Sequence, residues 1–98
     1  DGVNLLNDMD EDGVDNIIYL GYYYTKNALL PLKDLKQAVD YGNTILANAC
    51  KNSTANCTFV DPRSSISNSD IIFDGIHPAS SGSRKLADLI WPHLQPLL

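Results

Sequence analysis

A near-continuous apolar run occupies residues 16–24 and reads Asn-Ile-Ile-Tyr-Leu-Gly-Tyr-Tyr-Tyr. Strands that are buried on both faces of a parallel sheet have this composition, rich in β-branched and aromatic side chains. A second short run of the same kind, Cys-Thr-Phe-Val-Asp, follows at residues 57–61 and is stopped by Pro62. The chain therefore predicts two buried parallel strands.

Helical patterns surround the two strands. They are predicted at residues 3–9, from Pro31 to near Cys50, and from Pro78 to about Trp91. In the long middle helix an apolar stripe recurs every three to four residues, and polar residues including Asp40 and Asn43 are expected to face away from it. The order helix, strand, helix, strand, helix predicts an α/β fold with a parallel sheet and flanking helices.

Two strands are too few for a stable parallel sheet, which needs cover on both faces and usually three or more strands. We therefore expect residues 1–98 to be the C-terminal part of a single larger domain. Its missing strands would come from an N-terminal remainder of the same protein or from another copy of the chain.

Charge and cysteine content narrow the partners and the compartment. The formal net charge is −5 and the seven basic residues are scattered, which argues against a nucleic-acid partner. No apolar run is long enough to span a membrane. Cys50 and Cys57 close a short polar loop and are expected to form a disulfide, which favours a secreted or periplasmic protein.

An acidic segment raises the possibility of a calcium site. Asp8, Asp10 and Asp12 precede Gly13 with the spacing that opens an EF-hand loop, where alternate carboxylates converge on a hard cation. The twelfth position, which should be a bidentate Glu, is Tyr19. The plainer interpretation of this segment is a solvated acidic connection between a helix and a strand. If Asp8, Asp10 and Asp12 do hold calcium, the alternative function of the chain is a non-catalytic, secreted calcium-binding or interaction module.

The sequence Asp-Gly-Ile-His-Pro at residues 74–78 carries the candidate catalytic pair. A turn at Gly75 would bring the Asp74 carboxylate within reach of the His77 imidazole. A carboxylate on one ring nitrogen fixes the tautomer and leaves the other nitrogen as a general base. The plainer alternative is that Asp74 only caps the following helix.

This block, together with the Ser-Gly and Leu-Ala-Asp-Leu-Ile-Trp that follow it, resembles the last conserved block of the SGNH (GDSL) esterases. The resemblance implies a flavodoxin-like parallel sheet and a Ser-His-Asp triad that hydrolyses small-molecule esters without metal or organic cofactor. Asp74 and His77 would be its Asp and His. The Gly-Asp-Ser nucleophile block is absent, so this segment alone is expected to be inactive.

Two further groups of residues have a less specific pattern. Tyr22, Tyr23 and Tyr24 follow the first strand and so are expected near the carboxyl edge of the sheet, where substrates bind in open α/β folds; packing is the alternative. His93 is interpreted as a surface residue.

Overall fold

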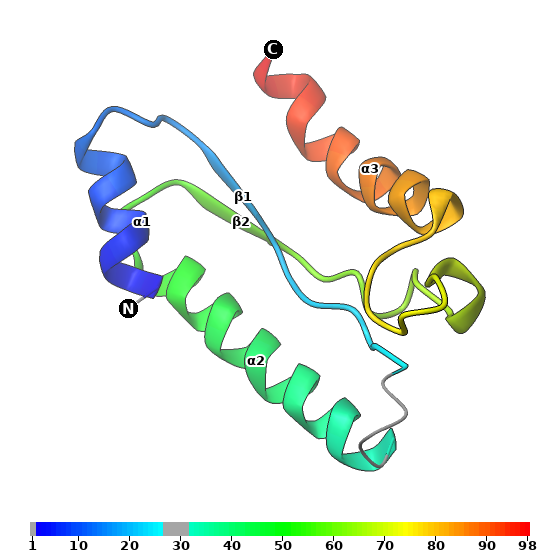
Figure 1. The fold of residues 1–98 in the computed structure, drawn as a ribbon. Coiled ribbons are helices and arrows are strands. Elements are labelled where there is room, and N and C mark those ends of the chain that lie inside the picture. The colour runs from blue at the N-terminus through cyan, green and yellow to red at the C-terminus, as the bar shows by residue number, and fades with distance from the viewer. Residues whose placement is uncertain (1, 27–31) are drawn as a thin grey trace.

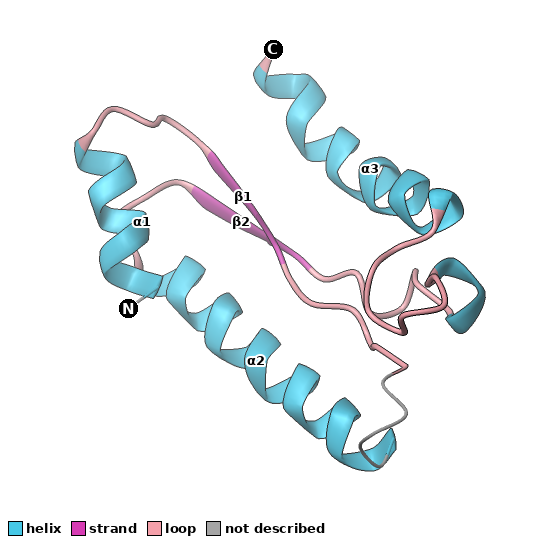
Figure 2. Ribbon diagram, in the orientation of Figure 1, coloured by secondary structure: helices cyan, strands magenta, loops and turns pink. Residues whose placement is uncertain are grey.

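The computed structural model describes residues 2–26 and 32–98 of the chain, and Pro31 lies outside them. The helices are α1 (Gly2–Glu11), α2 (Leu32–Asn52) and α3 (Ser80–Leu94), and the strands are β1 (Ile17–Leu20) and β2 (Cys57–Val60). Short 3-10 turns follow at Asn68–Asp70 and Gln95–Leu97. Figure 2 shows this mixed α/β content.

The two strands pair in parallel, with Ile17 opposite Cys57 and Leu20 opposite Val60. Helix α2 connects them and packs against β2, while α1 packs against α2. Helix α3 contacts both strands from the other side (Figure 1). The predicted α/β arrangement of a parallel sheet with helices on its faces is therefore confirmed for the part of the chain that the structure describes.

The first strand is shorter than its apolar run predicted. β1 ends at Leu20, and residues 21–26 continue without regular pairing because β2 offers only a four-residue partner. Gly21 still donates its N–H to the Val60 carbonyl at 2.9 Å. The aromatic residues beyond Gly21 therefore belong to an irregular tail at the carboxyl edge of the sheet.

Asn43 was predicted to face away from the core, and this is wrong. Its side chain is 1% exposed and binds the backbone of Tyr22, with Oδ1 accepting from the N–H at 2.7 Å and Nδ2 donating to the carbonyl at 2.8 Å. An amide can match a backbone peptide group in this way, so Asn43 supplies the pairing that a neighbouring strand would give.

The ends of the three helices also differ from the expected positions. Helix α1 spans Gly2–Glu11 and not residues 3–9. Helix α2 continues through Cys50 to Asn52, and α3 begins at Ser80 rather than at Pro78. Pro78 instead forms an isolated antiparallel bridge with Ile71. Near the other end, α3 contains Pro92 and continues to Leu94.

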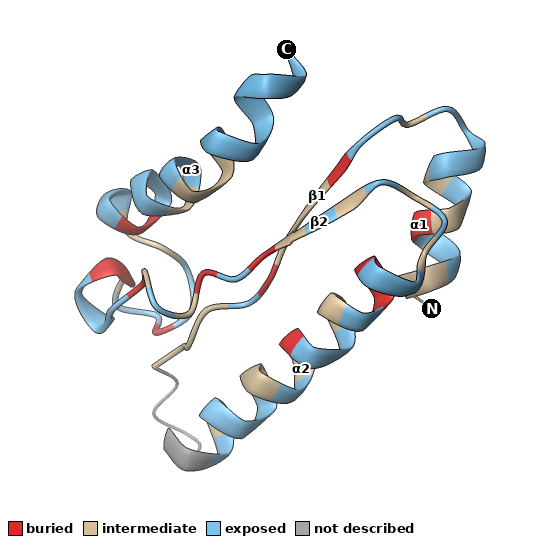
Figure 3. Ribbon diagram, turned by 180° about the vertical axis from the view of Figure 1, so that it is seen from behind, coloured by how far each residue is buried: buried red, intermediate tan, exposed pale blue. Residues whose placement is uncertain are grey.

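The core is small for a chain of this length. Its buried apolar residues gather between α1, α2 and the strands and around the loops after β2 (Figure 3); they are Leu6, Ile17, Ala49, Cys50, Val60, Ile66 and Ile71. The chain exposes 6473 Å², whereas a compact monomer of 10.8 kDa exposes about 5,500 Å². The excess is about 950 Å², similar to the roughly 800 Å² that each partner buries in a standard interface.

Candidate functional site

Residues 71–78, here called the 71–78 turn, fold back on themselves between the second strand and α3. Ile71 bridges Pro78, the Ile72 N–H binds the His77 carbonyl at 3.0 Å, and the Gly75 N–H binds the Ile72 carbonyl at 3.0 Å. Gly75 is buried and has φ +77°, a conformation that costs glycine little and other residues more. The glycine is therefore needed for the chain to reverse between Asp74 and His77.

The turn brings Asp74 and His77 into direct contact. Nδ1 of His77 lies 2.5 Å from Oδ2 of Asp74, and Oδ1 of Asp74 accepts the backbone N–H groups of Ile76 and His77 at 2.9 and 3.0 Å. The His77 side chain is 72% exposed and that of Asp74 is 31% exposed. This geometry uses Nδ1 for the carboxylate and leaves Nε2 available to a second partner.

The hydrogen bonds around Asp74 keep its carboxylate ionised. The bond from His77, followed by the two backbone N–H groups, lowers the pKa of Asp74 to about 2. An ionised carboxylate on one side of an imidazole orients the ring and stabilises its protonated form. The alternative that Asp74 caps the following helix is wrong, because α3 begins at Ser80 and its N-cap is Ala79. Oδ1 of Asp74 binds N–H groups of the turn itself, and Oδ2 binds the His77 ring.

The three consecutive tyrosines after β1 have different surroundings. Tyr23 Oη donates to the Ile76 carbonyl at 2.7 Å, within the 71–78 turn, and Tyr24 Oη donates to Oδ1 of Asp40 at 2.6 Å. Tyr22 is 57% exposed. Their position at the carboxyl edge of the sheet is as predicted, and contact of any of them with a substrate stays a prediction.

A charged cluster that the sequence reasoning missed lies at the same edge. Arg63 binds Asp61 through Nε and Nη2 and binds Asp40 through Nη1 at 2.7 Å. The Arg63 side chain lowers the pKa of Asp61, and the Tyr24 and Arg63 bonds lower the pKa of Asp40. The signal in the sequence was Asp61 itself, a carboxylate that directly follows a buried strand.

A second missed cluster surrounds Asp70, which is 2% exposed. Its carboxylate accepts the N–H of Ser67 at 2.9 Å, Oγ of Ser81 at 2.8 Å and Nζ of Lys85 at 2.7 Å. The Lys85 ammonium, followed by the Ser67 N–H and the Ser81 hydroxyl, holds the pKa of Asp70 far below its usual range. The cluster attaches the first turns of α3 to the segment before the 71–78 turn.

A nucleophile is the component that the described residues do not supply to the pair. Within residues 2–26 and 32–98, no serine hydroxyl forms a hydrogen bond with His77. The Ser67 hydroxyl binds Asp70 and lies 2.9 Å from the Ser69 hydroxyl, and the Ser81 hydroxyl also binds Asp70. These serines are therefore placed as structural polar residues.

The acidic segment forms a helix end instead of a cation loop. Asp8 and Asp10 belong to α1, and Gly13, at φ +94°, terminates the helix with its N–H on the Asp10 carbonyl and the Val14 N–H on the Met9 carbonyl. This is a Schellman cap. No group of three or more His, Cys, Asp or Glu side chains among the described residues is placed to hold a metal ion. The Asp8, Asp10 and Asp12 pattern thus gains no support as a calcium site.

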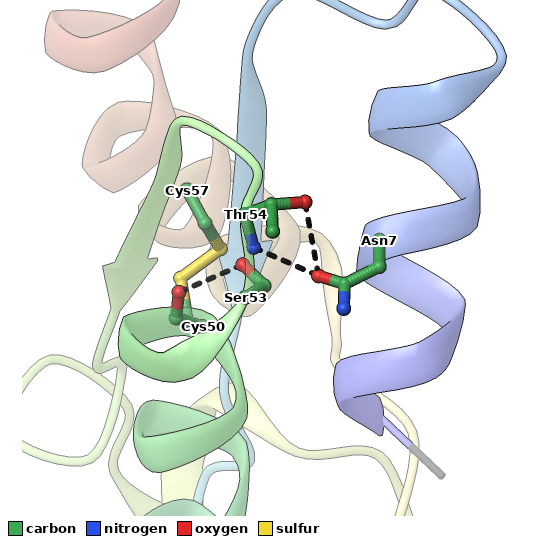
Figure 4. Close-up of a disulfide and its surroundings, with 5 residues drawn as sticks. All are labelled: Asn7, Cys50, Ser53, Thr54 and Cys57. Carbon is green, nitrogen blue, oxygen red and sulfur yellow. Dashed lines mark hydrogen bonds between the residues drawn. A yellow bond between two sulfur atoms is a disulfide. The ribbon is translucent and has the colours of Figure 1, made fainter.

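The predicted disulfide joins Cys50, near the end of α2, to Cys57 at the start of β2, and this prediction is confirmed. The loop inside the ring is held from both sides (Figure 4). Ser53 Oγ donates to the Cys50 carbonyl at 3.0 Å, and the Thr54 N–H donates to Oδ1 of Asn7 in α1 at 2.7 Å. The disulfide therefore lies at the amino end of β2, and the Asp74/His77 pair lies beyond its carboxyl end.

An open groove of about 240 Å³ lies between α1 and α2, lined by residues that include Val3, Ile45 and Asn52, and it contains neither Asp74 nor His77. No described helix has the length and apolar character required to cross a membrane. Comparison of the chain with protein-family models, curated proteins and solved structures found no match.

Proposed function

We propose that this chain is the C-terminal part of an SGNH-type ester hydrolase, with His77 as general base and Asp74 as its orienting carboxylate. The observation that supports the proposal is the contact of Asp74 with Nδ1 of His77 on a turn beyond the carboxyl end of β2, with the imidazole exposed. Ligands of open α/β sheets bind at that end of the strands.

The remaining components come from outside residues 1–98. The nucleophilic serine and the donors of the oxyanion hole belong to an N-terminal remainder of the same protein or to another copy of the chain. The excess exposed surface of about 950 Å² supports such a partner, because its size is that of one side of a standard interface. The disulfide supports a secreted or periplasmic location, where disulfides form and persist.

The reaction proceeds in two proton-balanced halves. His77 takes the serine hydroxyl proton through Nε2 as the serine oxygen attacks the ester carbonyl. His77 then gives that proton to the leaving alcohol, so an acyl-enzyme and a free alcohol result. In the second half His77 removes a proton from water, which attacks the acyl group, and the returned proton releases the carboxylic acid and restores the serine. Asp74 stabilises the imidazolium in both halves.

The test is aryl-ester hydrolysis by the protein that carries this chain together with its upstream sequence. We expect His77→Ala to abolish turnover, and Asp74→Asn to lower kcat by about 10³- to 10⁴-fold because the imidazole loses its orienting partner. His93→Ala is the matched control, since His93 is an exposed histidine at the end of α3. Ester hydrolysis that survives His77→Ala would refute the assignment.

A further inference from the structure

The tail of β1, residues 21–26, reaches the 71–78 turn after being fixed at two earlier points. Gly21 is bound to Val60 in the neighbouring strand, and the Tyr22 peptide groups are bound by Asn43 of α2. The next residues of this tail then contact the turn. Tyr23 and Lys26 are therefore held in place relative to the sheet, and their contacts fix the turn relative to the sheet as well.

The peptide group that joins Gly75 to Ile76 is held at both of its polar atoms. Its carbonyl oxygen accepts the N–H of Lys26 at 2.7 Å, and its N–H binds Oδ1 of Asp74 at 2.9 Å. The C=O and N–H of a trans peptide point in opposite directions. The tail of β1 and the Asp74 carboxylate therefore hold opposite sides of this peptide.

The following peptide group, which joins Ile76 to His77, repeats the arrangement. Its carbonyl oxygen accepts the Tyr23 hydroxyl at 2.7 Å, and its N–H binds the same Oδ1 of Asp74 at 3.0 Å. Here the partner on the β1 side is a side chain, so it can be removed by substitution without changing the backbone. This peptide ends at the Cα of His77, so its orientation determines the direction in which the His77 side chain leaves the backbone.

We propose that Tyr23 is a positioning residue for the Asp74/His77 pair, and that its hydroxyl fixes the peptide whose N–H binds the Asp74 carboxylate. The hydroxyl donates to a backbone carbonyl and not to Asp74 or His77, so it acts through the turn and takes no proton in the reaction. Burial, followed by the nearby Asp74 charge, raises the pKa of Tyr23 and keeps the phenol protonated as a donor.

Tyr23→Phe tests this proposal in the protein that carries this chain, because it removes one oxygen and leaves the ring. We expect the Ile76–His77 peptide to turn more freely and bind Asp74 less well. The amide of His77 should exchange about two- to tenfold faster, the range that the loss of one neutral hydrogen bond supports. The carboxyl carbon of Asp74, followed by NMR, should titrate above its starting pKa of about 2.

Tyr24→Phe is the matched control. It is the same substitution at the next residue and also removes a phenol hydrogen bond, but that bond goes to Asp40 and not to the turn. We expect it to leave the Asp74 titration and the His77 amide unchanged. The Gly21 amide, bound within the sheet, should keep its exchange rate in both variants.

Three results would overturn the proposal. They are an unchanged Asp74 titration and His77 amide in Tyr23→Phe, the same change in Tyr24→Phe, or an equal acceleration at Gly21, which would mean that the phenol stabilises the whole fold. The inference depends on the proposed function only for the catalytic meaning of the pair. If hydrolysis survives His77→Ala, the esterase assignment fails while these NMR measurements still decide the role of Tyr23.

Discussion

Asn43 binds Tyr22 through both ends of its side-chain amide, at 2.7 and 2.8 Å, although the two residues lie on different elements. The contact joins the middle of α2 to the residue just beyond β1. It fixes the direction in which the chain leaves the sheet, and the tail beyond it reaches the 71–78 turn. A buried polar residue on α2 thus determines the path of the segment that contacts the candidate site.

Replacement of Asn43 should therefore destabilise the fold. We expect Asn43→Ala to lower the free energy of unfolding by about 2 kcal/mol or more, because a backbone N–H and a carbonyl lose their partner. Asn43→Asp should also destabilise, since a carboxylate oxygen would then face the Tyr22 carbonyl. Urea unfolding measures the change. Asn48→Ala, at an exposed asparagine of the same helix, should stay within about 0.5 kcal/mol; an equal loss there would contradict the explanation.

Gly82 lies where the first turn of α3 meets the backbone of Asp70. A Cβ at this position would stand 2.4 Å from the Asp70 carbonyl oxygen, and backbone atoms cannot yield as a flexible side chain can. We expect Gly82→Ala to cost about 1 to 3 kcal/mol of stability, the usual cost of overpacking. The measurement is the thermal unfolding of Gly82→Ala, and the control is Ser83→Ala at the exposed neighbouring residue. A stability gain at Gly82 from higher helix propensity would show that this close approach does not exist in solution.

Acid should destabilise the chain. The pKa of Asp74 is lowered to about 2 and that of Asp70 is lowered further, while an unfolded aspartate titrates near 4. The unfolded chain therefore binds more protons than the folded one below about pH 4, and stability falls as pH falls. This stabilisation is fully present above about pH 4 and, for Asp74, is lost as pH approaches 2.

Urea midpoints at pH 7, 4 and 2.5 would measure the slope. Asp70→Asn should weaken the dependence between pH 4 and 2.5, because it removes one of the carboxylates with a lowered pKa. Asp88→Asn, at an exposed aspartate on α3, serves as the comparison. A midpoint that rises on acidification would mean that Asp70 and Asp74 are not bound as described.

Loss of the disulfide should destabilise the chain without changing its fold. The ring between Cys50 and Cys57 is short, and the chain-entropy treatment gives about 2.5 kcal/mol for its closure. We expect the double substitution Cys50→Ser and Cys57→Ser to lower the free energy of unfolding by about that amount. The reduced wild-type chain should match the double variant, and urea curves that do not respond to reductant would contradict the prediction.

The Asp74/His77 contact could be predicted from sequence because it is local. Asp74 and His77 are three positions apart, and Gly75 permits the required turn, so spacing and composition were sufficient. The strands were recognised by their apolar composition, but the length of β1 was overestimated because it depends on a partner strand. A run of tyrosines cannot show that β2 offers only four residues to pair with.

Several contacts that sequence reasoning missed join segments that are distant in the sequence. Asp70 meets Lys85 because the 71–78 turn folds back and places the first turns of α3 beside Asp70. Tyr23 meets Ile76 only because the tail of β1 passes the turn. Asn43 was assigned to the exposed side of α2 because polar residues usually face water. Its burial depends on an unpaired backbone at Tyr22, which no pattern within the helix indicates.

The disulfide between Cys50 and Cys57 lies at the amino end of β2, whereas the His77 imidazole lies beyond its carboxyl end. A thiol-rich medium would therefore loosen the connection between α2 and β2 first and leave the hydrogen bonds of the 71–78 turn in place. In such a medium the protein would become easier to digest while the Asp74/His77 contact persists, so resistance to proteolysis and the geometry of the candidate site depend on opposite ends of one short strand.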